Sequence, residues 1–357
     1  MTVNTISRSK LRAAQKALYE QSFYEFAKRA WSEIDPAILK DNWHIKVLCD
    51  HLQAVHEKKI NRLLINISPG SGKSMFVNVL YPAWLWTHSP FKRIISTSHK
   101  HPLAIRDSTR TRRLIKSEWY QSLWPIEIRE DQDSKGSFEN SKMGAREASS
   151  FSGMTGSRGN LVIVDDPHNV TDAGSAAVRG TAVSTFLEAI PSRLNDLVED
   201  SIIVVMQRIH VEDVSGAILS RPDLGYTHLC IPLIATGEKL PKTPLGWQDK
   251  RKIGEIMSPK QYPQSAIDAL KAGMGPFAFS GQYQQDPVPQ GDGFFQRDWF
   301  HRFKPEELPK TLNYYLTSDH APGGGKNNDY NVFRVWGVDE NKDLWLVDSF
   351  RKQCLMP

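Results

Sequence analysis

One short segment constrains the fold of this chain more than any other. The apolar run Leu63–Ile67 leads directly into the glycine-rich stretch Ser68-Pro-Gly-Ser-Gly-Lys-Ser74, and a helical pattern of apolar residues follows. A strand, a tight loop and a helix in this order turn successive backbone N–H groups toward an anion, and the helix dipole adds positive potential there. The segment therefore predicts an α/β fold with a phosphate-binding loop.

The residue types in this loop match the chemistry of a nucleoside triphosphate. Gly70 and Gly72 allow the backbone to approach the phosphates closely, and Lys73 supplies a positive charge to their oxygens. Ser74 offers its hydroxyl to Mg²⁺. We expect ATP to be bound by Pro69, Gly70, Ser71, Gly72, Lys73 and Ser74. Because the consensus has glycine where Ile67 stands, a glycine-rich turn without a ligand is the competing interpretation.

Further apolar runs predict the rest of the fold. Strand-like runs alternate with helical or loop segments, at Leu63–Ile67, Arg93–Thr97, Leu161–Val164, Ser201–Met206 and His228–Pro232. Strands separated by helices predict a mostly parallel sheet that is covered on both faces. Helical spacing of apolar residues at Leu11–Ala30 and Ile45–Val55 precedes the first strand.

The character of the chain changes near Asp286. The Pro- and Gly-rich segment Asp286–Gly293 predicts a linker. Strand-like runs at Thr311–Ser318, Val332–Val338 and Leu344–Val347 then predict a meander that opens a second α/β domain. We divide the chain into an N-terminal helical segment (1–40), a P-loop ATPase domain (41–285), a linker (286–300) and an incomplete second domain (301–357).

The composition excludes several classes of protein. The longest apolar stretch is far shorter than the roughly 20 residues that span a bilayer, which predicts no membrane association. The three cysteines are far apart, which argues against a disulfide framework or zinc site and favours the cytoplasm. The net charge of +5 is compatible with a polyanionic partner but does not by itself indicate one.

Two carboxylates follow the apolar run Leu161–Val164. In a parallel sheet, ligands bind at the carboxyl ends of the strands, which is where Asp165 and Asp166 are expected. We expect Asp165 to hold Mg²⁺ and Asp166 to polarise the attacking water. A turn that merely caps the strand is the alternative, but the phosphate loop earlier in the chain favours the catalytic role. Lys73 and Asp165 would then converge on one nucleotide at adjacent strand ends.

An arginine precedes this strand in the glycine-rich segment Phe151–Gly159. Arg158 is expected to lie beside the phosphate site, where it would stabilise charge on the transferring phosphoryl group in its own subunit or in a neighbour. A solvated surface arginine is the equally weighted alternative.

The order of the remaining motifs resembles the large subunit of phage terminases. The segment Gln207–Gly216 resembles the motif that is taken to couple hydrolysis to movement in that family, with Gln207, Arg208 and His210 as the coupling residues. Trp43-His44, the segment Ser98–Arg113 and the junction Phe279–Phe295 resemble further family signatures in the same order. The likeness runs from about residue 20 to the end of the chain.

This resemblance implies a fold of the additional-strand P-loop ATPases and a motor function. It implies a homo-oligomeric ring on the portal protein of a procapsid, ATP-driven translocation of double-stranded DNA, and a small terminase subunit as partner. Many terminases carry an arginine inside the phosphate loop, which Ser68–Ser71 lacks, and often glutamate where Asp166 stands. The role of Asp166 is therefore less secure than that of Asp165.

The second domain resembles the start of the terminase nuclease, which has an RNase H-like fold. Asp319 corresponds to its first acidic motif and would act in catalysis as a ligand of Mn²⁺ or Mg²⁺. Asp329 would be an accessory metal ligand, with a plain turn residue as the alternative, and Asp348 is interpreted as a structural strand residue. In the family the other carboxylates lie on later elements, so we expect this chain alone not to cleave DNA efficiently.

Two other functions remain open from the sequence. A P-loop helicase, or another ATPase that remodels nucleic acid, would share the phosphate loop and the acidic strand end. An inactive structural or regulatory fragment would bind partners without turnover. The arginines at 106, 110 and 113 share one helical face and could contact DNA phosphates, although a solvated face is the commoner explanation.

Overall fold

The computed structural model describes residues 7–154, 156–172, 174–237, 240–288, 300–320 and 331–352. Contacts divide the chain into two units, Met1–Asp292 and Gly293–Pro357. This division falls inside the predicted linker 286–300, of which residues 289–299 lie outside the described part. None of the described helices is long and apolar enough to cross a membrane.

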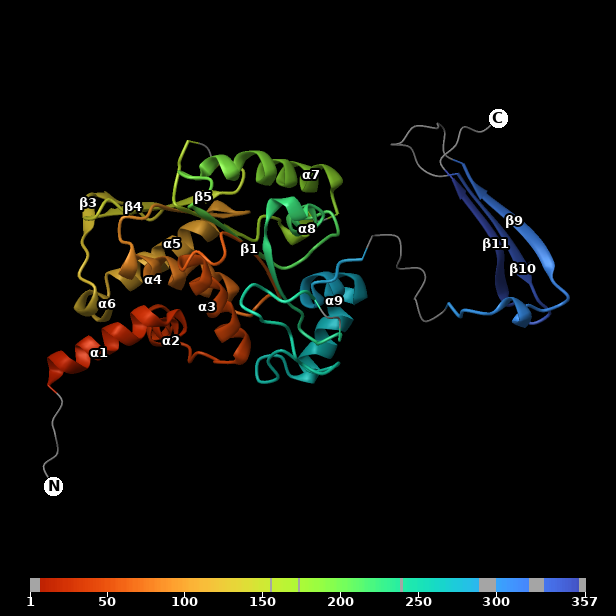
Figure 1. Ribbon diagram of the computed structural model, residues 1–357, viewed down its shortest axis with the longest axis horizontal. Coiled ribbons are helices and arrows are strands. Elements are labelled where there is room, and N and C mark those ends of the chain that lie inside the picture. Colours follow the sequence, from red (N-terminus) through yellow and green to blue (C-terminus); the bar gives the residue numbers. More distant parts are fainter. Residues whose placement is uncertain are drawn as a thin grey trace, which may run out of the picture. The chain divides into compact units, whose positions relative to one another are not determined.

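The larger unit is built on a twisted sheet flanked by helices (Figure 1). The eight described strands of this sheet have the order β3-β4-β5-β2-β6-β7-β1-β8. From β5 to β8 in this order all neighbours are parallel, and β3 and β4 form an antiparallel edge. The mostly parallel α/β fold is thus confirmed. The strands are β1 (Arg62–Ile67), β2 (Ile94–Ser98), β3 (Ile128–Asp133), β4 (Ser137–Asn140), β5 (Ala145–Ser150), β6 (Leu161–Asp165), β7 (Ser201–Met206) and β8 (Thr227–Ile231).

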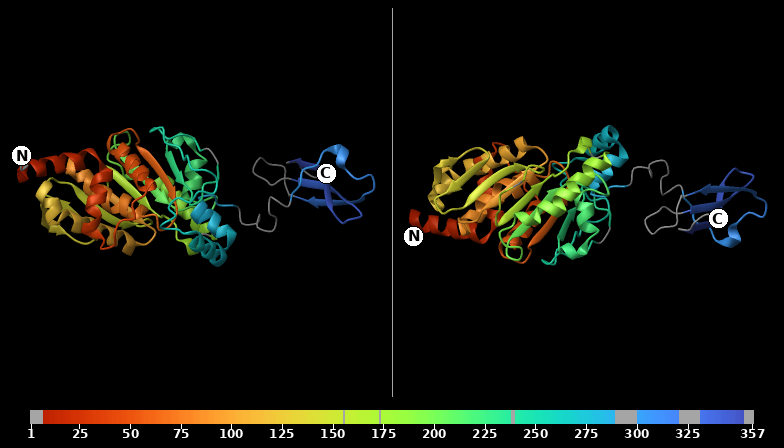
Figure 2. Two further views of the ribbon diagram at one scale, coloured as in Figure 1. Left: turned by 90° about the horizontal axis from the view of Figure 1, so that it is seen from below. Right: turned by 90° about the horizontal axis from the view of Figure 1, so that it is seen from above.

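Helices cover both faces of this sheet, as the views in Figure 2 also show. One face carries α1 (Arg8–Gln21), α2 (Phe23–Ile34), α3 (Trp43–His56), η1 (Met75–Leu80), α4 (Tyr81–His88), α5 (His101–Ile115) and α6 (Glu118–Leu123). The other carries α7 (Ala176–Ser184), η3 (Thr185–Ala189) and α8 (Val214–Leu219). The remaining described helices of this unit are η2 (Val170–Asp172), η4 (Pro191–Arg193), η5 (Pro222–Leu224) and α9 (Gln264–Gln284).

Side-chain alternation along the central strands produces a separate core on each face. In β1, Leu63 and Ile65 pack into the cluster under α2 to α5, whereas Leu64 packs into the cluster under η3 and α8. Both faces of the strand are buried, which is why its sequence is continuously apolar instead of alternating. This double burial makes the sheet a rigid support for the loops at its carboxyl edge.

The described part of the predicted N-terminal segment 1–40, residues 7–40, packs on the same core. The single helical pattern expected over Leu11–Ala30 is divided into α1 and α2 at Ser22, whose extended backbone ends one helix and whose hydroxyl caps the next. Phe23 and Phe26 of α2 are fully buried and pack against Trp84 and Trp124 respectively. These helices therefore stabilise the sheet domain and are not a separate body.

One expectation about strand order is wrong. Strands β1 and β6, which precede the phosphate loop and carry Asp165, are not neighbours, because β7 lies between them and pairs with both. This inserted strand is the arrangement that an additional-strand fold requires. It brings the end of β7, followed by Gln207, between the two predicted halves of the site.

The smaller unit has a three-stranded antiparallel sheet of order β11-β10-β9 in its described part. Its elements are η8 (Pro305–Glu307), β9 (Asn313–Asp319), β10 (Asn331–Val338) and β11 (Leu344–Lys352). The predicted meander is confirmed. Apolar side chains on both faces of this sheet are exposed, including Leu316 at 67% and Leu344 at 69%.

Candidate nucleotide-binding site

The loop between β1 and the following helix has the backbone conformation that its glycines predict. Gly70 and Gly72 have φ angles of +78° and +84°, which side chains other than glycine rarely adopt. The helix begins at Lys73 and continues through η1 into α4. The loop therefore turns sharply at the carboxyl edge of the sheet, where the N-terminus of the following helix also lies.

Lys73 is buried and is held by groups from two other strand ends. Its ammonium group lies 3.2 Å from Asp166 Oδ2 and donates a hydrogen bond to Gln207 Oε1. The backbone N–H of Gln207 in turn donates to Asp166 Oδ1 at 3.3 Å. The structure thus brings the predicted loop lysine, the second carboxylate of the acidic pair and one predicted coupling residue into direct contact.

Asp165 lies on the floor of the same site. It is 3% exposed, and burial, together with the charges of Asp166 and Asp107, raises the pKa of its carboxyl group to about 8. The Lys73 charge and a hydrogen bond with the Ser74 hydroxyl partly offset that rise. Lys73, Ser74 and Asp165 therefore converge, although β7 separates their strands.

These residues fit a magnesium ion. Asp165 Oδ1 is buried and has no hydrogen-bond partner among the described residues, which leaves a carboxylate oxygen free to bind a cation. Mg²⁺ prefers oxygen ligands and is commonly held by one carboxylate and a hydroxyl together with phosphate oxygens. No group of three or more acidic, histidine or cysteine side chains suited to a metal occurs in the described residues, so such an ion would depend on the nucleotide.

Asp166 is fixed by its backbone as well as by its side chain. Its φ of +44° is left-handed, an uncommon conformation for a residue other than glycine. Its carbonyl oxygen accepts the backbone N–H of His99 at 3.2 Å and lies 3.0 Å from His99 Nδ1. The backbone N–H of Asp166 donates to Val205 O at 2.9 Å. The turn after β6 is therefore tied to β2 and β7, and its carboxylate is directed at Lys73.

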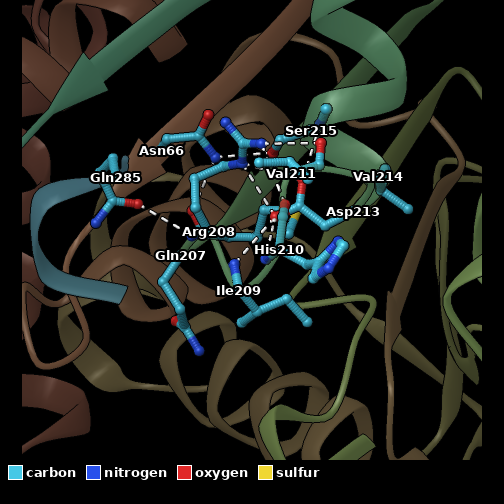
Figure 3. A network of polar contacts seen from close by, with 12 residues as sticks. Asn66, Gln207, Arg208, Ile209, His210, Val211, Asp213, Val214, Ser215 and Gln285 are labelled. Carbon is cyan, nitrogen blue, oxygen red and sulfur yellow. Dashed lines mark hydrogen bonds and ion pairs between the residues drawn. The ribbon is translucent and has the colours of Figure 1, made fainter. Parts of the chain in front are cut away.

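Arg208 and His210 stabilise the turn that follows β7 (Figure 3). The buried Arg208 guanidinium donates from Nε to both carboxylate oxygens of Asp213 at 3.0 Å and from one terminal nitrogen to the carbonyl oxygens of His210 and Val211. His210 Nδ1 accepts the Glu212 N–H, and burial lowers the pKa of its ring. Of the three predicted coupling residues, only Gln207 contacts Lys73, while the other two shape the segment that carries it.

The helix α9 and the turn before it wrap the phosphate loop. Tyr262 donates its hydroxyl to Pro69 O at 2.7 Å, and Gln261 donates to Gly70 O. At the other end of α9, the Tyr283 carbonyl accepts the Ser68 hydroxyl at 3.0 Å. These contacts span about 190 positions of sequence or more, and they fix the conformation of the loop.

The last turn of α9 also holds the segment that follows β7. Gln285 is buried, has a left-handed backbone at the end of α9, and accepts the Arg208 N–H at 3.1 Å (Figure 3). Its amide nitrogen donates to Gln282 O at 2.7 Å. Gln285 was not predicted as a site residue, because no local signal in the sequence links it to Arg208.

Asp107 is a second site residue that the sequence analysis missed. This α5 carboxylate is 1% exposed and lies close enough to Asp165 to raise the pKa of that group. Arg106 donates from Nε to Asp107 Oδ1 at 2.8 Å, and Arg110 lies 3.9 Å from the same oxygen. The sequence signal that could have indicated Asp107 is the presence of one aspartate among the arginines of this helix. Arg112, in contrast, pairs with Asp133 on the edge strand β3.

The structure does not bring Arg158 to the phosphate loop of its own chain. Arg158 is exposed and precedes Gly159, whose backbone N–H donates to Arg193 O near the N-terminal end of β6. Asp165 stands at the opposite end of that strand, six residues from Gly159 and so about 20 Å away at roughly 3.3 Å per residue. An arginine side chain does not cover that distance, so the expected place beside the phosphate site is not observed within one chain.

In the smaller unit, Asp319 stands exposed at the end of β9. Its strand partner on β10 is Val332, which pairs with Arg351, whereas Asp348 pairs with Val335. Because Val332 and Val335 are three residues apart, Asp319 and Asp348 lie on opposite faces of the sheet and cannot share an ion. Asp329, the predicted accessory ligand, lies outside the described residues.

The structure is similar to solved structures of phage large terminases. The large terminase of a thermophilic bacteriophage is 12% identical with a TM-score of 0.44, and the match covers 86% of this chain and 68% of that chain. The bacteriophage HK97 large terminase is 14% identical with a TM-score of 0.44, and the match covers 93% of this chain and 67% of that chain. The large terminase ATPase domain of Thermus phage P74-26 is 13% identical with a TM-score of 0.43, and the match covers 66% of this chain and 93% of that chain. The first of these proteins was also solved with ADP and with ATP-gamma-S.

No family model and no curated protein sequence matches the chain.

Proposed function

We propose that the larger unit hydrolyses ATP with Mg²⁺. The observation that carries this proposal is the convergence of Lys73 and Ser74, which follow β1, with Asp165 at the end of β6, where one buried carboxylate oxygen has no partner among the described residues. A glycine-rich turn without a ligand would not require a buried lysine and two buried or half-buried carboxylates beside it, because each costs free energy to desolvate.

In this proposal the residues divide the chemistry among them. The backbone of residues 69–74 wraps the phosphates, and Lys73 exchanges its contacts with Gln207 and Asp166 for phosphate oxygens. Ser74 and Asp165 hold the ion, which neutralises charge on the phosphates when it is bound. Asp166, released from Lys73, accepts a hydrogen bond from the attacking water and orients it.

Phosphate release by the full chain tests this function. With Mg²⁺ and ATP present, Lys73→Ala is expected to lower turnover by about 100-fold or more, since a charge on the transferring group is lost. Lys46→Ala, which removes an exposed lysine paired with Asp50 on α3, serves as the control and should leave turnover unchanged. Equal phosphate release by the wild type and Lys73→Ala would refute the proposal.

We further propose that hydrolysis drives translocation along double-stranded DNA, as in a terminase large subunit. Support comes from the ordered motifs of the sequence and from the direct contact between Gln207 of the coupling segment and Lys73. A homo-oligomeric ring that engages a portal protein and a small subunit in the host cytoplasm belongs to the same proposal. Arg158, which is exposed and remote from its own phosphate loop, would act across such a ring on a neighbour's nucleotide.

Displacement of a third strand distinguishes translocation from unwinding. A translocating motor displaces a triplex-forming oligonucleotide from blunt duplex DNA when ATP is present, whereas a helicase separates the strands of a forked duplex. We expect triplex displacement that Lys73→Ala abolishes. Separation of forked strands without triplex displacement would favour the helicase instead.

A further inference from the structure

The helix α5, which contains several arginines, begins at the same edge of the sheet as the phosphate loop. It follows β2, whose last residue Ser98 pairs with Asp165 in the strand register. The next residue, His99, is bonded to the Asp166 carbonyl, which fixes the start of α5 next to the acidic pair. The helix also packs on η1 directly behind the loop, where the Thr111 hydroxyl donates to Val79 O at 3.1 Å.

Asp107 anchors one arginine of α5 beside the site. The buried Asp107 accepts the Nε–H of Arg106 at 2.8 Å, while the Arg106 side chain stays 48% exposed. Within the described part of the chain, the two terminal nitrogens of Arg106 hydrogen-bond no protein atom. Arg110 differs, because one of its terminal nitrogens contacts Met75 Sδ at 3.2 Å. Asp107 therefore holds the Nε atom of Arg106, while the two terminal nitrogens remain available to donate hydrogen bonds to a ligand.

The carboxyl groups of the site and a bound triphosphate would together carry more negative charge than Lys73 alone balances, so a further cation is expected nearby. Asp107, Asp165 and Asp166 gather three carboxyl groups near a single loop lysine, and the loop itself contains no arginine. A triphosphate adds further negative charge, of which the terminal phosphate carries the largest share. A planar guanidinium with two free N–H₂ groups is suited to bind two oxygens of one phosphate.

We propose that Arg106, positioned by Asp107, binds the terminal phosphate of ATP within the same subunit and distinguishes ATP from ADP. This inference rests on the proposed ATP hydrolysis but assigns a residue that the phosphate-loop motif does not contain. Asp107 acts as a positioning residue: it fixes the guanidinium by Nε and leaves both ends free. Arg106 therefore contributes to the discrimination between nucleotides and to the rate of the chemical step.

The affinities of the full chain for ATPγS and for ADP, both with Mg²⁺, test this role. In the wild type we expect tighter binding of ATPγS than of ADP. Arg106→Ala should reduce that preference by about tenfold with the ADP affinity unchanged, and it should lower kcat by about tenfold or more. Arg106→Lys should recover part of the preference, because it restores charge but not the two-pronged geometry.

Arg113→Ala is the matched control, since Arg113 is an exposed arginine two turns further along α5. It should leave the nucleotide preference unchanged. Suppose that the wild type hydrolyses ATP but Arg106→Ala keeps the same preference for ATPγS over ADP. That result would overturn this inference and leave the proposed function intact. Lost DNA affinity with unaltered nucleotide preference would equally overturn it, because the arginine would then bind DNA phosphates. A wild type that binds neither nucleotide would remove both proposals together.

Discussion

At the scale of single residues, the buried carboxyl of Asp165 would link proton binding to the proposed binding of Mg²⁺. Because its pKa is raised to about 8, we expect this carboxyl to be protonated in the free protein at neutral pH, whereas a bound Mg²⁺ would require the carboxylate. If Asp165 holds Mg²⁺ as proposed, binding of the ion with nucleotide would release this proton. The cause is first the burial of the group and then the nearby charges of Asp166 and Asp107.

This coupling predicts a pH-dependent affinity for Mg²⁺ and nucleotide. Below pH 8 the affinity should rise with pH by up to about tenfold per unit and then level off above pH 8. Isothermal titration calorimetry in buffers of different ionisation enthalpy would measure the released proton. Asp107→Asn, which removes one neighbouring charge, should move the transition to lower pH. A proton release that is absent at pH 7 would contradict the assignment.

The same group predicts the stability of Asp165→Asn. The folded-state pKa lies above the ordinary value of 3.8, so unfolding releases a proton between about pH 4 and 8, and wild-type stability falls as pH rises through that window. The neutral asparagine does not titrate, so its contribution to stability does not fall as the pH rises. We expect Asp165→Asn to be more stable than the wild type at pH 8 by about 1 kcal/mol or more, and by less at pH 5, in thermal unfolding, while hydrolysis is abolished.

Gly216 shows how a backbone contact can require glycine without a left-handed conformation. A Cβ atom at Gly216 would lie 1.8 Å from Val211 O, in the turn that Arg208 and Asp213 stabilise. Gly216→Ala should lower the free energy of unfolding by about 2 kcal/mol or more, because the turn has to shift. Gly180→Ala, in α7 with no atom within 4 Å of the added Cβ, is the control and should be neutral or slightly stabilising. Equal denaturation midpoints for the two variants would refute this.

At the scale of elements, α9 connects the phosphate loop with the segment after β7. Gln285→Ala would leave the buried Arg208 N–H without its acceptor, at a cost of about 1–3 kcal/mol. We expect faster amide hydrogen exchange at residues 206–210 and weaker nucleotide binding. Gln282→Ala, which changes a side chain one turn earlier, should have little effect on either. Unchanged exchange in Gln285→Ala would show that the contact does not position the segment.

The elements also show what a sequence can and cannot predict. Strands β1, β6 and β7 were predicted nearly residue by residue, because burial on both faces makes them continuously apolar. The edge strand β3 was missed, since its sequence Ile128-Arg-Glu-Asp-Gln-Asp133 is polar and mostly exposed. The loop and the acidic pair were found from local motifs, whereas Gln285, Tyr262 and Asp107 join the site only through distant contacts that leave no local pattern.

At the scale of the whole molecule, all described contacts of the nucleotide site lie within Met1–Asp292. Both hydrophobic clusters of that unit are complete without the smaller one. We therefore expect residues 1–292 alone to fold and to hydrolyse ATP at a rate within about threefold of the full chain, as a phosphate-release assay would measure. An unfolded or inactive fragment would show that the smaller unit contributes to the site.

The smaller unit should not cut DNA efficiently. Among the described strands β9, β10 and β11, no carboxylate shares a face of the sheet with Asp319, and two-metal cleavage needs several. With Mn²⁺ present, nicking of supercoiled plasmid is expected to stay near background for the full chain. Robust nicking that Asp319→Ala abolishes would contradict this expectation.

The pairing of Lys73 with Gln207 and Asp166 has a thermodynamic consequence. The amide of Gln207 and the carboxylate of Asp166 would compete with a phosphate ligand for the Lys73 ammonium group, and in the proposal the ligand displaces them. A triphosphate would also engage the loop backbone and the proposed ion, contacts that a single inorganic phosphate would make only in part. We therefore expect the contacts of Lys73 with Gln207 and Asp166 to favour triphosphates over inorganic phosphate.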